Sequence, residues 1–209
     1  MCSSDLSIRL ATGVLILPQR NPLVLAKEVA TLDAMSGGRV ELGVGVGWLR
    51  EEFEALGVPF EDRGKRTDEY VEVLRRLWSE PATAHAGDFA RFAEVQSYPK
   101  PARTGGPRIH VGGHTLAAAR RAGRIGDGFF PGRDLDTLVP AMREAAQEAG
   151  RDPNSIVVSA GGKPDLATVE EYRERYGIER FMVPPLGANA DRILAFLDTF
   201  AEKVIAPSR

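Results

Sequence analysis

The segment 9–53 constrains the fold of this chain more than any other part. It contains two predominantly apolar stretches, each suited to a buried strand, with a helix-like segment between them. Strands that are apolar on both faces and are joined through a helix indicate a parallel sheet covered by helices. The second stretch ends in Gly43-Val44-Gly45-Val46-Gly47-Trp48, and glycines where a strand ends let the backbone approach a flat ring or a phosphate.

The helix between these strands has clear end signals. Asn21 suits the N-cap, Pro22 the first helical position, and Gly37-Gly38 the end. A spacing of three and four residues predicts one buried face. The residues of that face are Leu25, Val29, Leu32 and Met35.

The same alternation continues along the chain. We expect strands at 7–17, 39–46, 108–112, 128–131, 155–160 and 180–183. Beside the helix at 22–36, we expect helices at 51–56, 66–79, 115–123, 135–149, 168–176 and 189–203. The segment 81–101 breaks the pattern and reads as an inserted hairpin or lid loop. Two architectures fit: a doubly wound open sheet is complete with six strands, whereas a (β/α)₈ barrel needs eight units and about 250 residues.

Composition narrows the class of protein. The chain has 209 residues, of which 43% are hydrophobic, and a net charge of −2, which suits one globular domain and gives no reason to expect nucleic acid or a membrane as partner. It has neither a signal-peptide pattern nor a long apolar run, so we expect a cytoplasmic protein. One Cys and three scattered His give no metal-ligand spacing. We expect His85 to face solvent and His110 to be a satisfied core residue.

Several motifs, in this order, resemble the luciferase-like monooxygenase superfamily, and most closely its branch dependent on the deazaflavin coenzyme F-420. The residues that carry the resemblance are Thr12-Gly13-Val14, Pro18, Arg20, Pro22, Ser36-Gly37-Gly38-Arg39, Leu42-Gly43-Val44-Gly45, Gly47-Trp48, Gly112-Gly113 and Asp127-Gly128-Phe129-Phe130-Pro131. The resemblance implies a (β/α)₈ barrel that here lacks its first two βα units. Residues 7–209 would then form a single partial TIM-barrel domain. Residues 2–6, Cys-Ser-Ser-Asp-Leu, match the translation of a sequencing-adapter end, and we expect residues 1–6 to be foreign.

The resemblance also implies where a cofactor binds. The strand that carries Thr12, Gly13 and Val14 would hold a bulge with a cis peptide at Gly13-Val14, behind the central ring of the flavin; the plain alternative is a glycine that narrows a strand. Gly45, Val46, Gly47 and Trp48 would lie along the ring, or form a tight turn with Trp48 as a plug. The full dinucleotide fingerprint is absent here, because Arg50 stands where its third glycine would be.

A second glycine pair comes much later in the chain. Gly112, Gly113 and His114 join a strand to a helix that Thr115 can cap, and free N–H groups at a helix start suit a phosphate. In the family, this turn holds the cofactor's phosphate. The physical pattern alone indicates only a ligand that bears a phosphate.

These features predict a flavin- or deazaflavin-dependent oxidoreductase that transfers a hydride between its cofactor and an organic small molecule. Coenzyme F-420 is the expected cofactor, with FMN as the alternative, and no catalytic side chain is identified. Because family members often carry their general acid on the strands missing here, we expect the isolated chain to be inactive. A non-redox isomerase or aldolase with a phosphate site, for which Lys163 is the candidate catalytic residue, and a non-enzymatic subunit are the rival hypotheses. The family favours homodimers.

Overall fold

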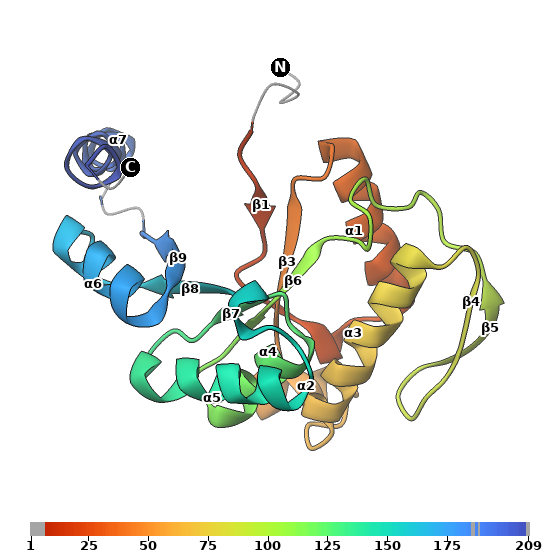
Figure 1. Ribbon diagram of the computed structural model, residues 1–209. Helices are drawn as coiled ribbons and strands as arrows, with labels where there is room; N and C mark the ends of the chain where they lie inside the picture. Colours follow the sequence, from red (N-terminus) through yellow and green to blue (C-terminus); the bar gives the residue numbers. More distant parts are fainter. Residues whose placement is uncertain (1–6, 185–186, 188, 208–209) are drawn as a thin grey trace. The chain divides into compact units, whose positions relative to one another are not determined.

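The computed structural model describes residues 7–184, 187 and 189–207 (Figure 1). The expected foreign segment 1–6 lies outside this range. The described chain forms two compact units. The first comprises the chain up to Gly113 together with the segment Ile125–Asp127, and the second comprises His114–Arg124 and the chain from Gly128 onward.

The first unit is built on parallel strands. Strand β3 (Val40–Gly45) pairs with β1 (Leu10–Ala11), β2 (Leu15–Ile16) and β6 (Arg108–Gly112), always in parallel. The continuous strand predicted at 7–17 is therefore wrong, because the chain leaves the strand line between β1 and β2. A short 3-10 helix, Leu17–Gln19, follows β2.

Three helices belong to the first unit. They are α1 (Pro22–Ser36), α2 (Arg50–Ala55) and α3 (Arg63–Ser79). The end signals of α1 are confirmed: the Asn21 side chain accepts the N–H groups of Leu23 and Val24, and Gly37 ends the helix with a φ of 67°. Helices α1 and α3 pack together, and the indole N–H of Trp78 donates to the carbonyl of Ala26 at 3.0 Å.

The predicted buried face of α1 is only partly right. Leu25 and Val29 are buried, but Leu32 is 57% and Met35 81% exposed. Asp33 is buried in their place, because its carboxylate accepts the backbone N–H groups of Val40 and Arg103. Because Asp33 bonds to these two N–H groups, the buried face of α1 includes Asp33 and not Leu32 or Met35.

The segment predicted as an insertion is an antiparallel hairpin. Its strands are β4 (Thr83–Ala86) and β5 (Arg91–Val95). The hairpin lies beside α3 in Figure 1, and the contacts of Glu69 described below fix its tip to that helix.

The second unit repeats the pattern of parallel strands and helices. Strand β8 (Val157–Gly161) lies between β7 (Gly128–Phe130) and β9 (Ile178–Met182), and both pairings are parallel. The helices are α4 (Leu116–Ile125), α5 (Leu135–Glu148), α6 (Leu166–Tyr176) and α7 (Ala190–Phe200), with a 3-10 turn at Pro153–Ser155 and a π-helical turn at Ala201–Ile205. Each predicted element of this unit is present within three residues of its expected bounds.

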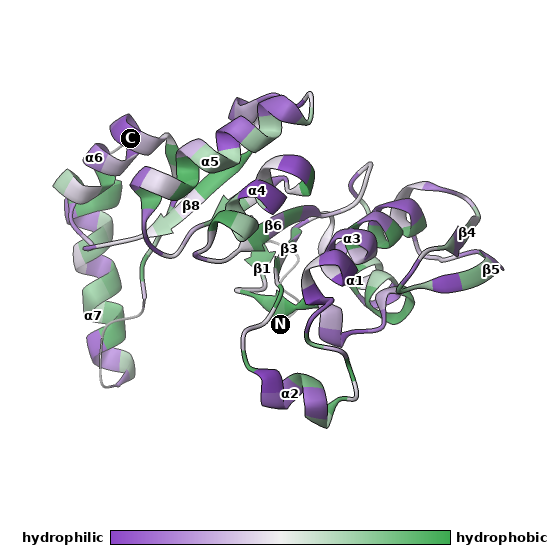
Figure 2. Cartoon of the chain, turned by 90° about the horizontal axis from the view of Figure 1, so that it is seen from below, coloured by the Kyte–Doolittle hydropathy of each residue, from purple (hydrophilic) through white to green (hydrophobic). Residues whose placement is uncertain are grey.

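Helix α7 is the least buried helix of the second unit. Figure 2 colours much of it hydrophobic, yet Leu194 is 59% and Leu197 45% exposed, and no described residue of the helix is buried. Among the described residues, no helix combines the length and apolarity needed to cross a membrane.

Candidate functional site

The break between β1 and β2 is a bulge formed by Thr12, Gly13 and Val14. The Gly13–Val14 peptide bond is cis, as the family resemblance implies. The Thr12 hydroxyl donates to the carbonyl of Gly43 at 2.7 Å, which ties the bulge to the middle of β3.

The Val14 side chain occupies space that two glycines leave open. A Cβ atom on Gly45 would lie 2.9 Å from Val14 Cγ2, and one on Gly112 would lie 2.8 Å from Val14 Cγ1. A Cβ atom on Gly43 would collide with the Thr12 carbonyl. The glycines of β3 and β6 are thus required for the bulge to pack against these strands, before any role in ligand binding is considered. The two glycine-bearing strand ends, 67 positions apart in the chain at Gly45 and Gly112, meet at one side chain.

Val14 keeps part of its surface free. The residue is 39% exposed although glycine positions of β3 and β6 enclose its side chain on two sides. An apolar side chain that is fixed and half exposed suits contact with a flat ring.

The chain turns sharply after β3. Gly47 has a φ of 79°, and a Cβ atom there would lie 2.7 Å from the Phe53 ring and 2.9 Å from Ile16. Trp48 follows and is 81% exposed, so it does not plug the fold as the plain alternative supposed. An exposed indole is suited to contact a flat ligand.

The predicted phosphate turn lies at the end of β6. Gly113 has a φ of 145°, a conformation that favours glycine. The chain then enters α4, whose Ala118 N–H donates to the Thr115 hydroxyl at 3.2 Å. His114 belongs to the second unit, where its Nδ1 lies 3.0 Å from the position of a Cβ atom on Gly132. Thr12, Gly13, Val14, Gly45, Val46, Gly47, Trp48, Gly112 and Gly113 all belong to the first unit.

A buried charged group lies on the face of β3 that Val14 contacts. Glu41 and Gly43 point to one side of β3, and His110 is the β6 partner of Gly43. The Glu41 carboxylate is fully buried, 2.8 Å from His110 Nε2 and 2.7 Å from Arg9 Nη1. His110 is a satisfied core residue, as expected. The sequence analysis missed Glu41, and a lone glutamate inside an apolar strand was the available signal.

One carboxylate of α3 holds the tip of the hairpin. Glu69 accepts the backbone N–H groups of Asp88, Phe89 and Ala90 at 2.7–3.1 Å. His85 Nε2 lies 3.2 Å from the same carboxylate, and its side chain is only 9% exposed, so the expectation that it faces solvent is wrong. Burial raises the pKa of Glu69, but the hydrogen bonds outweigh it and hold the pKa below its ordinary value.

Lys163, the residue on which the aldolase hypothesis depends, is exposed and paired. Its ammonium lies 2.8 Å from the Asp165 carboxylate, and 81% of its side chain is exposed. The hydrogen bond with Asp165 raises the pKa of Lys163. A lysine that forms a Schiff base needs a lowered pKa and a desolvated site, and Lys163 has neither.

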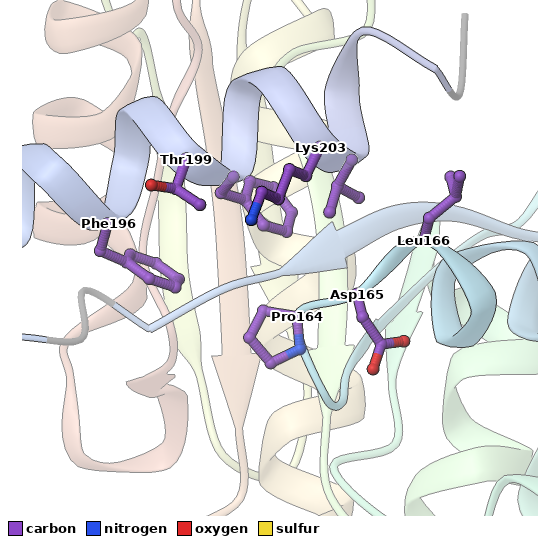
Figure 3. A pocket seen from close by; sticks show the side chains of 8 residues that line it. Pro164, Asp165, Leu166, Phe196, Thr199 and Lys203 are labelled. Carbon is purple, nitrogen blue, oxygen red and sulfur yellow. The ribbon is translucent and has the colours of Figure 1, made fainter.

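A cavity of about 230 Å³ lies in the second unit, and none of the predicted site residues lines it (Figure 3). It lies between the start of α6 and one side of α7. Its lining residues are Pro164, Asp165, Leu166, Phe196, Thr199, Phe200, Lys203 and Val204. Among the described residues, no group of His, Cys, Asp and Glu has the arrangement of a metal site.

Comparison with known proteins identifies relatives over nearly the whole chain. The luciferase-like monooxygenase family matches residues 4–201. An uncharacterized protein of Mycobacterium tuberculosis is 37% identical over 210 residues, which cover 92% of this chain and 70% of that protein.

Two relatives have named activities. An FMNH(2)-dependent dimethylsulfone monooxygenase from Pseudomonas putida is 35% identical over 66% of this chain and 39% of its own length. An F420-dependent glucose-6-phosphate dehydrogenase from Segniliparus rotundus is 36% identical over 71% of this chain and 47% of its own length.

The fold is also that of a solved relative. The crystal structure of the monooxygenase RslO1 from Streptomyces bottropensis matches 96% of this chain and 78% of its own, with a TM-score of 0.82 and 26% identity. The expected fold class, α/β with an incomplete (β/α)₈ barrel, is confirmed. The extent of the family match and the identity to the mycobacterial relative show that this chain belongs to the luciferase-like monooxygenase family.

Proposed function

We propose that this chain binds the deazaflavin coenzyme F-420 and that the protein is an oxidoreductase that transfers a hydride between this cofactor and an organic small molecule. The observation that carries the proposal is the position of Val14, which packs against Gly45 and Gly112 and is still 39% exposed. The F420-dependent relative supports the choice of cofactor.

The residues present fit a ring that carries a phosphate. Val14 offers a fixed apolar surface for one face of the ring, and Trp48 offers an exposed aromatic surface after the next strand. Gly112 and Gly113 end β6 in the same unit, and their backbone, free of side chains, lets a phosphate approach closely.

When bound, the deazaflavin supplies the hydride, and the protein supplies binding, orientation and exclusion of water. Val14 would support one face of the ring, and Thr12 holds Val14 in place by tying the bulge to Gly43. His110 and Glu41 contact each other below the bulge, and we assign them no part in the reaction.

FMN is the second candidate cofactor, and the FMNH(2)-dependent relative favours it. FMN and coenzyme F-420 share a tricyclic ring and a phosphate, so the features above suit both. The two proposals differ in the cofactor that binds more tightly.

The experiment is a titration of the 209-residue chain with each cofactor, followed by cofactor fluorescence and by calorimetry. We expect saturable binding of coenzyme F-420, tighter than that of FMN. Val14→Ala removes apolar surface and should weaken binding about three- to tenfold. The matched control is Val24→Ala, an exposed valine on α1, which should leave binding unchanged. Tighter binding of FMN selects the alternative, and binding of neither cofactor rejects the proposal.

A further inference from the structure

The bend that follows β3 is held by one guanidinium group. Arg63, the first residue of α3, donates from Nε to the carbonyl of Gly47 at 3.3 Å. The same side chain donates from Nη1 to the carbonyl of Phe60 at 3.0 Å. Arg63 therefore ties the start of α3 to the residue immediately before Trp48.

Packing fixes Gly47 from the other side. Its missing side chain leaves room for the ring of Phe53 and for Ile16. Phe53 is fully buried and meets Phe60 edge to face, with ring centroids 5.3 Å apart. Gly47 is thus enclosed by these apolar side chains, and its carbonyl is held by Arg63.

Two guanidinium groups contact the Phe60 ring, and only that of Arg63 is also bonded to the Gly47 carbonyl. The Arg63 guanidinium is 3.8 Å from the ring centroid and that of Arg50 is 4.5 Å from it. Arg50 forms an ion pair with Glu61 at 2.7 Å, and both of these side chains are more than half exposed. Arg50 therefore shares the contact with Phe60 but not the hydrogen bond to Gly47, which makes it a matched control for Arg63.

Trp48 is carried by this fixed stretch of backbone. With 81% of its surface exposed, its indole has little protein contact of its own. The backbone held at Gly47 therefore sets the position and direction of the Trp48 Cα–Cβ bond, and the indole projects from there through its χ1 and χ2 rotamers.

We propose that Arg63 is a positioning residue for the cofactor site: it holds the Gly47 carbonyl and thereby orients Trp48 against the bound ring. This inference rests on the proposed function. Arg63 acts through Gly47 and Trp48 and does not itself touch the cofactor.

The chain provides a built-in optical test, because it has two tryptophans in opposite surroundings. Trp48 is exposed, whereas Trp78 is 3% exposed and bonded through its indole N–H. Quenching by acrylamide therefore reports mainly on Trp48, and Trp48→Phe measures its share. In the protein without cofactor, we expect Arg63→Gln to lower the fluorescence anisotropy of Trp48, while Arg50→Gln leaves it unchanged.

The decisive measurement combines Arg63→Gln and Trp48→Phe in a double-mutant cycle of cofactor affinity. Alone, Arg63→Gln should weaken binding about tenfold, the effect of one lost hydrogen bond. In the Trp48→Phe background, the same substitution should cost less than about threefold if it acts through the indole ring. Arg50→Gln should leave the affinity unchanged. If Arg63→Gln fails to fold, Arg63→Lys, which keeps a donor, replaces it and should show a smaller loss.

The outcomes separate this inference from the proposed function. If the parent chain binds the cofactor and Arg63→Gln binds equally well, the inference is wrong and the proposed function stands. An equal loss with and without Trp48 also overturns the inference. If the parent binds neither coenzyme F-420 nor FMN, both proposals are rejected.

Discussion

A methyl group of Val14 lies 2.8 Å from the point where Gly112 would carry a Cβ atom. The other methyl group stands in the same relation to Gly45, at 2.9 Å. Because Val is branched at Cβ, its χ1 angle is stiff and the side chain cannot swing away from one contact without entering another. The two glycines are therefore a structural requirement of the bulge, whatever ligand the site binds.

Gly112→Ala should destabilise the fold and disturb the site together. The added methyl group overlaps Val14, and overpacking of this kind costs about 1–3 kcal/mol in the free energy of unfolding. We expect urea denaturation to show this loss and cofactor affinity to fall with it. Val14→Ala in the same chain should restore most of the stability.

The matched control is Gly161→Ala at the end of β8. There, a Cβ atom would lie 3.5 Å from the Met182 carbonyl, an ordinary contact, so stability should change by less than about 0.5 kcal/mol. A Gly112→Ala protein as stable as the parent would contradict this account of the glycines.

Glu69→Ala should release the hairpin from α3. Its carboxylate accepts three consecutive backbone N–H groups of the hairpin tip, and the substitution leaves them without this partner. Since a hydrogen bond to a charged group contributes about 1.5–3 kcal/mol, we expect a loss of about 2–3 kcal/mol in the free energy of unfolding. Faster hydrogen exchange at Phe89 and Ala90 would place the change at the tip. Glu72→Gln, an exposed glutamate of the same helix, should have almost no effect.

The same carboxylate makes stability depend on pH. The pKa of Glu69 is lower in the folded chain than its ordinary value of 4.5, so the folded state favours the ionised form. Its contribution is complete above the unfolded pKa and is lost as the pH falls through the folded pKa. Urea denaturation should show a fall in stability below about pH 4.5 that is smaller in Glu69→Gln than in the parent. Equal pH profiles for the two proteins would show that Glu69 is not responsible.

The local signals in the sequence predicted the elements well. The ends of α1 were predictable because they depend on local contacts: Asn21 bonds to residues two and three positions later, and Gly37 adopts a left-handed conformation that glycine favours. The bounds of β6 are those expected, because a short apolar run between turn residues leaves little freedom. The buried face of α1 was harder to predict, since Asp33 is buried by contacts with Val40, beyond the end of the helix, and with Arg103, 70 positions along the chain.

The candidate site was predictable only as separate pieces. The motifs indicated the bulge and both glycine pairs, but the meeting of Gly45 and Gly112 at Val14 depends on the register of β3 with β2 and β6. The hydrogen bonds of Glu69 with the hairpin and of Arg63 with Gly47 join residues 16 or more positions apart. No periodicity marks such contacts, so the sequence alone did not reveal them.

Lys163→Ala should leave cofactor binding unchanged and alter the titration of Asp165. The pKa of Asp165 is lowered to about 2, first by the hydrogen bond from Lys163 and then by the N–H of Thr168 at the start of α6. Removing the ammonium should raise this pKa toward its ordinary value, which NMR titration of the carboxyl carbon can follow. Borohydride trapping of a carbonyl compound on Lys163 would instead support the aldolase hypothesis.

The exposed edge of β1 should make this chain self-associate. β1 ends the strand order of its sheet and, among the described strands, pairs with β3 alone. Ile8 is 63% and Leu10 56% exposed beside this edge, and an open apolar edge strand promotes pairing with another chain. We expect light scattering after size-exclusion chromatography to show dimers or larger species whose share rises with protein concentration.

Leu10→Lys should shift this equilibrium toward monomer, because a charge on an edge strand opposes pairing. Leu194→Lys, at a leucine of similar exposure on helix α7, is the control and should have a smaller effect. If both substitutions reduce association equally, general apolar contact is responsible and not strand pairing. A parent chain that stays monomeric at all concentrations would show that the edge is protected in another way.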